Sequence, residues 1–453
     1  MRKILFISSE AIGIFIAKRL SDRGNEVYYF CKSKEQESVG NGLKNIIKIK
    51  APTFKLKEND KNPKKSEELY YKTLIFYLKP YLKKCDFTFF DDSGMGSLAD
   101  MITSQGYKVV GSSSFMDELE IDRVLAFDIM KKYTSIKIPE YKEFNSIKKG
   151  IAFLEGEYGD KYVFKLFSDN GDKSLTYMSI DDENESLIEF MKTMENDKEE
   201  YVLQKIIPGE FVELSSEGWF NGNQFVDGAW NHTYEKKRLM DGDIGPQTGS
   251  AGSVIWSCDA DRIIRTALLP LTPILKKNKY CGPIDINLII QGDEAWFLEF
   301  TPRCGYAGID CVLSLILDDP GEFLYKLSTG NSQEVSMSQD YAVAIGLTTL
   351  PMDGDPKDEK LWQGMKILNI PAKMEPYTYL QCCYWDQEGN PRATGTGGSV
   401  GTIVGTGETV EKAVSSAYEI IDKIKFTKDL LYRSDIGSDF KEKYEDLEEA
   451  GWL

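Results

Sequence analysis

The chain has 453 residues, which is long for one compact domain and corresponds to about three domains. Asp and Glu number 72 against 55 Lys and Arg, and the resulting formal charge of −17 disfavours general binding to nucleic acid. No apolar run reaches the roughly 18 to 20 uncharged residues that a membrane helix needs. We therefore expect a soluble, multi-domain protein, monomeric or homodimeric, whose partners are small molecules rather than nucleic acid or a membrane.

Cysteine and histidine usage narrows the chemistry. The eight cysteines are scattered and form no C-x-x-C pair, which predicts a reducing, cytoplasmic location. His232 is the single histidine, so His-rich metal sites and mechanisms that need several imidazoles are excluded. The apolar start of the chain imitates a signal peptide, but Glu10 and Lys18 interrupt it, and we predict a strand and a helix instead.

The first 115 residues alternate between apolar runs and helical patterns. Residues 3–8 form a short apolar run, a helical pattern follows as far as Arg23, and a second run occupies 27–30. A further predicted strand at 87–90 is followed by a helix and by the strand 108–111. This alternation is typical of a parallel sheet covered by helices, and it predicts an N-terminal α/β domain.

The rest of the chain shows a different pattern of predicted strands and helices. We predict a charged helix over 118–132, after which strands dominate to about residue 300. The last third begins with the apolar run 341–347, continues through a Gly/Thr-rich hairpin region at 394–402 and closes with a helix over 409–424. The lysine-rich stretch 55–65 is expected to be a solvated loop.

These patterns define a mixed fold of α/β and α+β type with three domains. We place an N-terminal parallel α/β domain at 1–117, a central domain at 118–333, and a mainly β domain with a helix at 334–453.

Two lysines flank a predicted turn in the central domain. The strand 162–165 ends in Lys165, and Lys173 lies in the turn Gly-Asp-Lys-Ser that follows. Ammonium groups beside the N–H groups of a turn can hold nucleotide phosphates, although exposed lysines near turns are also ordinary. In the segment 201–213, strand backbone could bind an adenine edge and Glu210 could bind ribose hydroxyls. An ordinary β-meander with solvated carboxylates is the alternative.

A glycine-rich segment at 237–252 has too many glycines for a packed element. Structureless loops of this length are usually functional or disordered. We therefore predict a mobile flap that excludes water from a reactive intermediate, with Lys237 and Arg238 bringing positive charge to an anionic substrate.

Two predicted strands joined by the turn 291–294 carry the clearest candidate for a metal site. Alternation along the strands lets the oxygen-bearing side chains of Asn287, Glu299 and Thr301 face one pocket. Oxygen ligands suit Mg²⁺, which usually bridges few protein groups to nucleotide phosphates. Arg303, just beyond, could stabilise charge on a transferred phosphoryl group. The alternative is a hairpin whose polar residues face solvent.

In this order, these segments resemble the ATP-grasp enzymes, and within them most closely the glycinamide ribonucleotide synthetases (phosphoribosylamine–glycine ligases). Residues 237–252 repeat that family's spacing of Lys-Arg, Asp-Gly-Asp, Gly-Pro and Thr-Gly. Residues 405–413 and 432–437 resemble the start of its C-terminal helix and its terminal Tyr-Arg-x-Asp-Ile-Gly. The resemblance covers nearly the whole chain and implies that the central domain is an ATP-grasp domain.

The resemblance also implies roles for individual residues. For ATP, the implied binding residues are Lys165, Lys173, Gln204, Lys205, Ile206 and Glu210. For Mg²⁺ or Mn²⁺, the implied ligands are Glu299, Asn287 and Thr301. The implied catalytic cations are Arg303, Lys237 and Arg238, and the implied substrate residues are Glu235, Ser9 and Ser93.

Departures from the family pattern gather on the acceptor side. The family's first strand ends in a glycine-rich turn that receives the sugar phosphate, whereas residues 8–13 keep one glycine and add Glu10. The family's Gly-Pro-Glu after a later strand is replaced by Asp91-Asp92-Ser93. Thr301 stands where the family has asparagine. The resemblance is therefore stronger for the ATP half of the site than for the phosphoribosylamine half.

The chemistry implied by the resemblance is phosphorylation of a carboxylate by ATP, followed by attack of an amine on the acyl phosphate. Glycine and phosphoribosylamine are the default substrates, which would place the chain in purine biosynthesis, and a changed amine is a variant of this hypothesis. A second hypothesis is a nucleotide-binding homologue without ligase turnover. A third is an ATP-grasp enzyme that forms carboxyphosphate, as biotin carboxylases do.

Overall fold

The structure is a computed structural model of the chain. It describes residues 1–52, 63–157, 159–166, 176–194, 198–332, 334–349, 363–368, 370, 376–395, 399–426 and 430–453. Lys173 and most of the lysine-rich stretch 55–65 lie outside the described residues. No helix in the described part of the chain combines the length and the apolar character that crossing a membrane requires.

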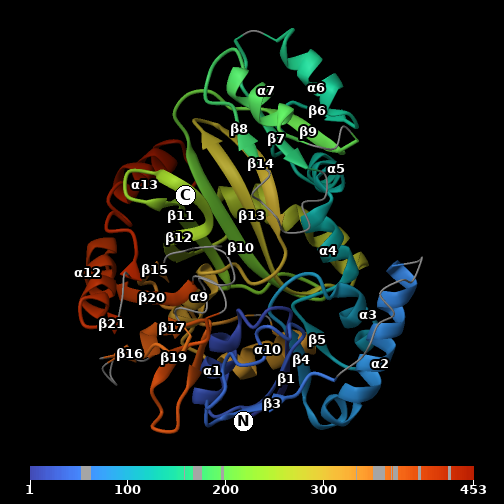
Figure 1. The fold of residues 1–453 in the computed structure, drawn as a ribbon, viewed down its shortest axis with the longest axis vertical. Coiled ribbons are helices and arrows are strands. Elements are labelled where there is room, and N and C mark those ends of the chain that lie inside the picture. The colour runs from blue at the N-terminus through green and yellow to red at the C-terminus, as the bar shows by residue number, and fades with distance from the viewer. Residues whose placement is uncertain are drawn as a thin grey trace.

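The N-terminal part is a five-stranded parallel sheet with the strand order β3-β2-β1-β4-β5 (Figure 1). Its elements are β1 (Lys3–Ser8), α1 (Ile14–Asp22), β2 (Glu26–Cys31), β3 (Ile46–Ile49), α2 (Pro63–Lys84), β4 (Phe87–Phe90), α3 (Gly96–Ser104) and β5 (Val109–Val110). Ile4 and Phe6 pack on the side of α1, and Leu5 and Ile7 pack on the side of α2 and α3. Because both faces are covered, the strands are continuous apolar runs, as the sequence predicted.

The helix predicted over 118–132 is in fact two helices, α4 (Ser114–Ile121) and α5 (Arg123–Tyr133). Asp122 breaks the run because its backbone is extended and its side chain accepts a hydrogen bond from the N–H of Leu125 (3.0 Å). Aspartate is a favoured N-cap residue, since its carboxylate satisfies a backbone donor at the start of a helix. The break places Arg123 at the first position of α5, close to the candidate site.

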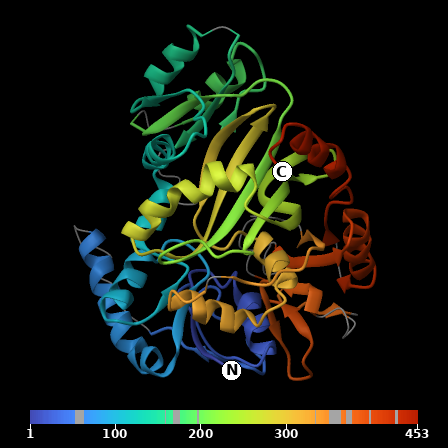
Figure 2. The same ribbon diagram turned by 180° about the vertical axis from the view of Figure 1, so that it is seen from behind.

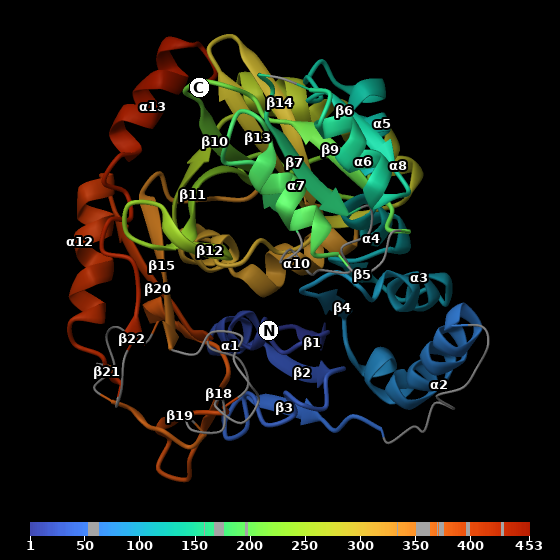
Figure 3. The same ribbon diagram turned by 45° about the horizontal axis from the view of Figure 1, so that its top comes forward.

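A small antiparallel sheet follows, with the strand order β6-β9-β7-β8. Its elements are β6 (Tyr141–Phe144), α6 (Ile147–Leu154), β7 (Tyr162–Leu166), β8 (Tyr177–Met178), α7 (Glu185–Lys192) and β9 (Tyr201–Lys205). Phe164, Leu187 and Tyr201 belong to its separate hydrophobic core. Figures 1 and 3 show that this small lobe lies beside one end of the large central sheet.

The central sheet has nine strands, in the order β14-β13-β10-β11-β12-β15-β20-β17, with β22 also paired to β15. The strands from the middle of the chain are β10 (Val212–Asn221), β11 (Trp230–Met240), β12 (Ile244–Cys258), β13 (Cys281–Gln291) and β14 (Glu294–Thr301). Between them lie η2 (Ile264–Leu268), η3 (Leu269–Leu271) and α8 (Thr272–Lys277). The sheet continues across the boundary expected near 333, because β15 pairs with β12.

The glycine-rich segment is not a structureless loop, and that expectation was wrong. Residues from Ile244 onward form β12, which pairs with β11 in a long hairpin. Gly252 allows close packing in the strand, because a Cβ atom at that position would lie 2.5 Å from Ile436 Cδ1. The outer arm of the hairpin, residues 241–247, is exposed, so the segment is an ordered arm rather than a packed core element.

The C-terminal part extends the central sheet beyond β12 and adds helices beside it (Figure 2). Its elements are α9 (Gly308–Leu315), α10 (Pro320–Ser328), β15 (Tyr341–Thr349), β16 (Ile367–Leu368), β17 (Thr378–Leu380), β18 (Cys383–Trp385), β19 (Pro391–Ala393), β20 (Ser399–Gly407), α12 (Val410–Ile421), β21 (Lys425–Phe426), β22 (Leu430–Leu431) and α13 (Phe440–Glu449). The hairpin expected at 394–402 is wrong, because β19 pairs with β18 whereas β20 pairs with β15 and β17. The expected helix after Thr409 is present as α12, which the Thr409 side chain caps.

Arg433 fastens the C-terminal segment to the β11–β12 hairpin. Its side chain is fully buried, and its guanidinium donates two hydrogen bonds to the carboxylate of Asp435, both of 2.7 Å. It also donates to Asp243 at the hairpin turn (2.7 Å) and to the carbonyl oxygen of Arg238 (2.9 Å). The hairpin that was expected to be mobile is therefore anchored at its turn.

Replacing Arg433 with alanine is expected to lower the free energy of unfolding by about 3 kcal/mol, because the change leaves partly buried carboxylates without their cation. Chemical denaturation followed by far-UV circular dichroism would measure the loss. Arg23→Ala, which removes an exposed arginine after α1, is the matched control and should change stability by less than about 0.5 kcal/mol. Equal stability of the two variants would show that this ion cluster does not anchor the hairpin.

Candidate functional site

Two rows of polar side chains cross four strands on one face of the central sheet. Register partners in an antiparallel sheet project to the same face, so the pairing fixes which residues meet. The first row, across β11, β10, β13 and β14, is Asn231, Glu217, Asp285 and Thr301. The second row is Thr233, Ser215, Asn287 and Glu299. The oxygen-bearing residues expected to share a pocket, Asn287, Glu299 and Thr301, thus occupy one face of two neighbouring strands.

Lys165 approaches this face from the small lobe. It lies on β7 and is half-buried, and burial together with the positive charge of Arg123 lowers the pKa of its ammonium group to about 7. The carboxylates of Glu299 and Glu213 act in the opposite direction, which shows that they lie close to the same ammonium group. Lys165 and Glu299 therefore lie near one another although they belong to two different lobes.

Arg123 completes the contact between the lobes. Its Nη1 atom lies 4.0 Å from Glu299 Oε2, and its Nε–H group donates to the carbonyl oxygen of Leu166 (3.1 Å). The side chain is buried. Arg123 was not predicted as a site residue, since nothing in the sequence distinguishes an arginine at the start of a helix from a surface one. It is found only through its tertiary contacts.

Lys237 reaches the site from β11. Its ammonium group lies 2.5 Å from Glu213 Oε1. Burial opposes its charge, but Glu213, Glu235 and Glu299 outweigh burial and raise its pKa above the usual value. The three carboxylates therefore favour the charged form of the Lys237 side chain. Arg238 is exposed instead and donates to the carbonyl oxygen of Gly245 within the hairpin (2.8 Å), so the structure does not bring it to the Lys165–Glu299 pair.

The segment expected to hold adenine follows β9. The backbone N–H groups of Lys205 and Ile206 donate to carbonyl oxygens of Glu140 and Lys161 (both 2.8 Å), and the Lys205 side chain pairs with Asp160 (2.6 Å). The backbone N–H groups of Lys205 and Ile206 and the Lys205 ammonium group therefore already form bonds within the small lobe.

Two side chains of the same segment differ in their surroundings. Gln204 is buried, and its Oε1 atom has no hydrogen-bond partner among the described residues. Glu210, the expected ribose ligand, is exposed. Gln204 thus offers a buried acceptor, whereas Glu210 remains accessible from solvent.

Arg303 connects β14 to the N-terminal domain. Its Nε atom lies 3.2 Å from Glu120 Oε1 and 3.5 Å from Asp92 Oδ1. Ser9 donates to Asp92 Oδ2 (2.8 Å), and the backbone N–H of Ser93 bonds to Asp92 Oδ1 (2.9 Å). The structure therefore gathers Ser9, Ser93 and Arg303 around Asp92, which the sequence had not singled out as a site residue.

Two buried carboxyl groups lie deeper on the polar face. Glu217 and Asp285 are register partners on β10 and β13. Burial raises the pKa of Glu217 to about 7, although Asn231 and Trp219 both donate to its Oε1 atom (3.0 Å each). Burial, with the charge of Glu217, also raises the pKa of Asp285 well above its usual value, and Ser215 donates to it (2.7 Å). Strand alternation could have placed Asp285 beside Asn287, but nothing in the sequence indicated its pairing with Glu217.

A pH-dependent contribution to stability follows from Glu217. Its pKa is raised in the folded state from 4.5 to about 7, so its stabilising contribution is complete below about pH 4.5 and is lost as the pH rises through 7. Glu217→Gln keeps the acceptor oxygen and removes this titration. The variant should gain about 3 kcal/mol relative to the wild type between pH 4.5 and pH 8, measured by denaturant unfolding. Parallel pH profiles for the two proteins would refute the assignment.

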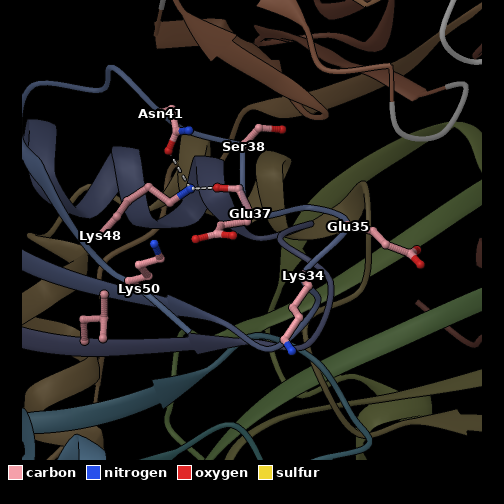
Figure 4. Close-up of a pocket in the computed structure, with 8 residues that line it drawn as sticks. Lys34, Glu35, Glu37, Ser38, Asn41, Lys48 and Lys50 are labelled. Carbon is pink, nitrogen blue, oxygen red and sulfur yellow. Dashed lines mark hydrogen bonds between the residues drawn. The ribbon is translucent and has the colours of Figure 1, made fainter. Parts of the chain in front are cut away.

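A pocket of about 530 Å³ lies elsewhere, between the loop after β2 and strand β3 (Figure 4). It is lined by Lys34, Glu35, Glu37, Ser38, Asn41, Lys48, Ile49 and Lys50. The ammonium group of Lys48 donates to the carbonyl oxygens of Glu37 and Val39 and to Asn41 Oδ1 (3.0 Å). Because these bonds use all three of its protons, Lys48 closes the loop onto β3 and is not available to a ligand.

His232 lies on the opposite face of β11 from Thr233 and takes no part in the site. Its ring bonds to Ser216 Oγ (2.8 Å) and to Asp261 Oδ2 (2.6 Å), and Asp261 also accepts from the N–H of Ile264 (3.0 Å). His232, Asp261 and Cys258 together form the group of possible metal ligands found in the described ranges. Their contacts join β10, β11 and the η2 segment, which is a structural role.

The chain is similar to known proteins both in sequence and in fold. No protein-family model matches the chain. A phosphoribosylamine–glycine ligase of Streptococcus pneumoniae (strain R6) is 27% identical over 366 residues, covering 77% of this chain and 82% of that relative. The solved phosphoribosylamine–glycine ligase of Thermotoga maritima has a TM-score of 0.67 at 20% identity, covering 96% of this chain and 100% of that one. A Campylobacter jejuni biotin carboxylase–βγ-ATP complex has a TM-score of 0.61 at 12% identity, covering 99% and 96%.

The chain shares its fold, the predicted mixture of a parallel sheet and antiparallel sheets, with these solved structures of a phosphoribosylamine–glycine ligase and a biotin carboxylase. In sequence, the chain is similar to phosphoribosylamine–glycine ligases over 77% of its length. The resemblance stated from the sequence is therefore confirmed. The expectation of an ATP-dependent ligase is confirmed at the level of enzyme class.

Proposed function

We propose that this protein uses ATP to convert the carboxylate of an amino acid, glycine by default, into an acyl phosphate, and then transfers the acyl group to an amine. The observation that carries the proposal is the meeting of Lys165, Lys237 and Glu299 at one site, contributed by two lobes. Phosphoryl transfer depends on positioning and on charge stabilisation more than on a protein nucleophile. A site rich in cations and without histidine suits that chemistry.

Binding of the nucleotide is supported by side chains that can still form contacts with a ligand. Lys165 and Lys237 present ammonium groups toward the same carboxylates, so polyphosphate oxygens entering between them would meet two cations. Gln204 offers a buried carbonyl oxygen that can accept a hydrogen bond from an adenine amino group. We assign the phosphates to the lysines and the base to the neighbourhood of Gln204.

The residues at the proposed metal position fit Mg²⁺ or Mn²⁺. Glu299 supplies a carboxylate, its register partner Asn287 supplies an amide oxygen, and Thr301 supplies a hydroxyl on the same face. One carboxylate with neutral oxygens matches an ion that keeps several waters and binds mainly to phosphates. When held by Glu299, Asn287 and Thr301, such an ion would neutralise negative charge on the transferred phosphoryl group.

The proposed reaction has two steps, phosphoryl transfer to the carboxylate and acyl transfer to the amine. The substrate carboxylate oxygen attacks the γ-phosphorus of ATP, the bond to the β-phosphate oxygen breaks, and ADP leaves. The amine nitrogen then attacks the acyl carbon, the carbon–oxygen bond to phosphate breaks, and the amine proton leaves with phosphate or water. In the first step Lys165 and Lys237 orient the phosphates, and Arg303 stabilises charge beside β14. Glu235 would hold the ammonium group of the amino acid.

The setting proposed for this reaction is the cytoplasm, in purine biosynthesis for the default substrates. The eight cysteines, all within the described ranges, form no disulfide there, which is consistent with a reducing compartment. Monomer and homodimer remain the expected assembly states.

Trapping with hydroxylamine tests the first step without knowledge of the natural amine. Hydroxylamine attacks an acyl phosphate to form a hydroxamate, so glycine, ATP and Mg²⁺ should give glycine hydroxamate and ADP in equal amounts. Omission of glycine should abolish both products. ADP formation that requires bicarbonate instead of an amino acid would identify a carboxyphosphate-forming enzyme. Nucleotide binding without ADP formation from any carboxylate would identify a homologue without turnover, and either result would overturn the proposal.

A further inference from the structure

Three side chains with different donor atoms converge where β12 ends. Cys258 is the register partner of Trp230, and His232 lies two residues further along β11, so His232 and Cys258 project from one face of the sheet. Asp261 reaches them from the connection between β12 and η2. The ligand atoms of the three side chains, a ring nitrogen, a sulfur and a carboxylate oxygen, all lie within 4.8 Å of one another. These residues therefore form a compact group of metal-binding atoms.

The donor set identifies the class of metal. One nitrogen, one sulfur and one oxygen suit Zn²⁺, which binds all three types of atom and prefers four ligands in a tetrahedron. Mg²⁺ prefers oxygen atoms alone, so this group differs in chemistry from the proposed ligands beside Glu299. His232 also projects from the opposite face of β11 to Thr233, which shares a row with Glu299. A metal bound here is therefore separate from the proposed nucleotide site.

A Zn²⁺ ion fits between the three atoms after a small movement. His232 Nε2 lies 2.6 Å from Asp261 Oδ2. Two ligand atoms of a tetrahedral Zn²⁺ ion lie about 3.3 Å apart, so the carboxylate has to retreat by about 0.7 Å. The Asp261 side chain is 13% exposed and belongs to a connecting segment rather than to a strand. It can therefore make this movement, and the ion can enter from solvent.

The imidazole and the carboxylate both have outer partners of the kind that orient metal ligands. Ser216 Oγ lies 2.8 Å from His232 Nδ1, and the backbone N–H of Ile264 donates to Asp261 Oδ1 (3.0 Å). The buried His232 ring also packs beside the Trp256 ring, with 5.4 Å between their centroids. These contacts leave Nε2 and Oδ2 as the atoms directed at the shared position.

The surrounding charge favours a cation. Burial raises the pKa of the Cys258 thiol, and the negative charges of Asp261 and Asp259 raise it further. The thiol is therefore protonated without a metal, whereas a bound divalent ion deprotonates a coordinating thiol. The thiolate and the Asp261 carboxylate then balance the two positive charges of the ion.

We propose that His232, Cys258 and Asp261 bind one Zn²⁺ ion, with water at the fourth position. On binding, the thiol proton leaves to solvent, and the imidazole proton occupies Nδ1, from which it is donated to Ser216 Oγ. The ion joins the start of β11 and the end of β12 to η2, and it stabilises the folded chain by binding to it preferentially. This inference does not depend on the proposed ligase function.

Cobalt(II) tests the site, because Co²⁺ accepts the same ligands as Zn²⁺ and is coloured. The full chain is freed of metal with a chelator and titrated with Co²⁺ in the absence of oxygen. We expect one Co²⁺ ion per chain, a thiolate-to-cobalt charge-transfer band in the near ultraviolet, and the strong visible bands of tetrahedral Co²⁺. Zn²⁺ should remove these bands because it binds such sites more tightly, whereas excess Mg²⁺ should not.

Variants assign the ligands. Cys258→Ser should abolish the charge-transfer band, and Cys85→Ser, which changes a thiol at the end of α2, should retain it. Ser216→Ala keeps the three ligands and removes only the partner of His232 Nδ1, so it should weaken Co²⁺ binding about tenfold. Absence of stoichiometric Co²⁺ binding to the wild type, or a charge-transfer band that persists in Cys258→Ser, would overturn the inference.

Alkylation of the wild type provides a test that does not depend on the folding of any variant. Zn²⁺ should slow the reaction of Cys258 with iodoacetamide at least about tenfold, because a metal-bound thiolate is shielded, and it should leave the rate at Cys85 unchanged. Peptide mapping by mass spectrometry measures both rates. Equal rates at Cys258 with and without Zn²⁺ would contradict the assignment.

Discussion

The Glu299→Ala variant is expected to lose at least about 1,000-fold in ADP formation while remaining folded. Glu299 is coupled to cations of both lobes, because it lies 4.0 Å from Arg123 and its charge raises the pKa of Lys165 and of Lys237. Removing it deletes the anionic ligand of the proposed metal and leaves the neutral oxygens of Asn287 and Thr301. Loss of a ligand that acts on developing phosphate charge should lower kcat more than it changes KM for the amino acid.

Stability is the control for this variant. Glu299 is partly exposed and lies at the edge strand of the sheet, so its removal creates no core cavity. The thermal midpoint should therefore stay within a few degrees of the wild type. Glu294→Ala removes a carboxylate from the other end of β14, where it pairs with Lys137 at the surface, and should retain full activity. Full activity of Glu299→Ala would remove the metal assignment.

Lys165→Met is expected to raise the ATP concentration required for half-maximal rate at least about tenfold and to lower kcat. Lys165 is the small lobe's ammonium group at the site, and burial together with Arg123 lowers its pKa to about 7. Phosphate oxygens would restore the favourable environment that its charge lacks in the free protein. Methionine fills a similar volume without offering a hydrogen bond to phosphate, so ATP binding should suffer most.

The Lys165→Met variant should lose ATP use without losing stability. The folded-state pKa of Lys165 is below its usual value of 10.5, so the unfolded chain binds more protons between pH 7 and pH 10, and wild-type stability gains from this group as the pH rises through that range. Lys165→Met removes the buried charge and should be at least as stable as the wild type at pH 7. Lys161→Met, which removes an ammonium paired with Asp182 at the surface, should change neither property. Loss of stability together with unchanged ATP use would show that Lys165 is a structural residue.

The local features of the fold could be predicted from the sequence, and the exceptions have physical causes. The buried strands at 3–8, 27–30 and 87–90 are continuous apolar runs because helices cover both faces of their sheet. The break at Asp122 was missed because a capping side chain overrode a run of good helix formers. The strand β12 was missed because its structure depends on pairing with β11 and β15 and, at Gly252, on packing against the distant Ile436, and periodicity records neither.

Some residues of the candidate site could likewise be predicted from the sequence, and others could not. Strand alternation correctly grouped Asn287, Glu299 and Thr301, since a period of two fixes which side chains share a face. Arg123 and Asp92 could not be found by such a rule, because their roles arise from contacts between lobes and between strand ends that are distant in sequence. Lys173, which the resemblance assigns to ATP phosphates, lies outside the described residues, and its role stays a prediction.

A crystal structure of the protein with Mg²⁺ and a non-hydrolysable ATP analogue tests the central assignment most directly. The phosphates are predicted to lie within hydrogen-bond distance of the Lys165 ammonium group, with the ion bound to Glu299 and the adenine near Gln204. Nucleotide bound at the N-terminal sheet or in the pocket beside Lys48, with Lys165 and Glu299 left untouched, would contradict the proposed site.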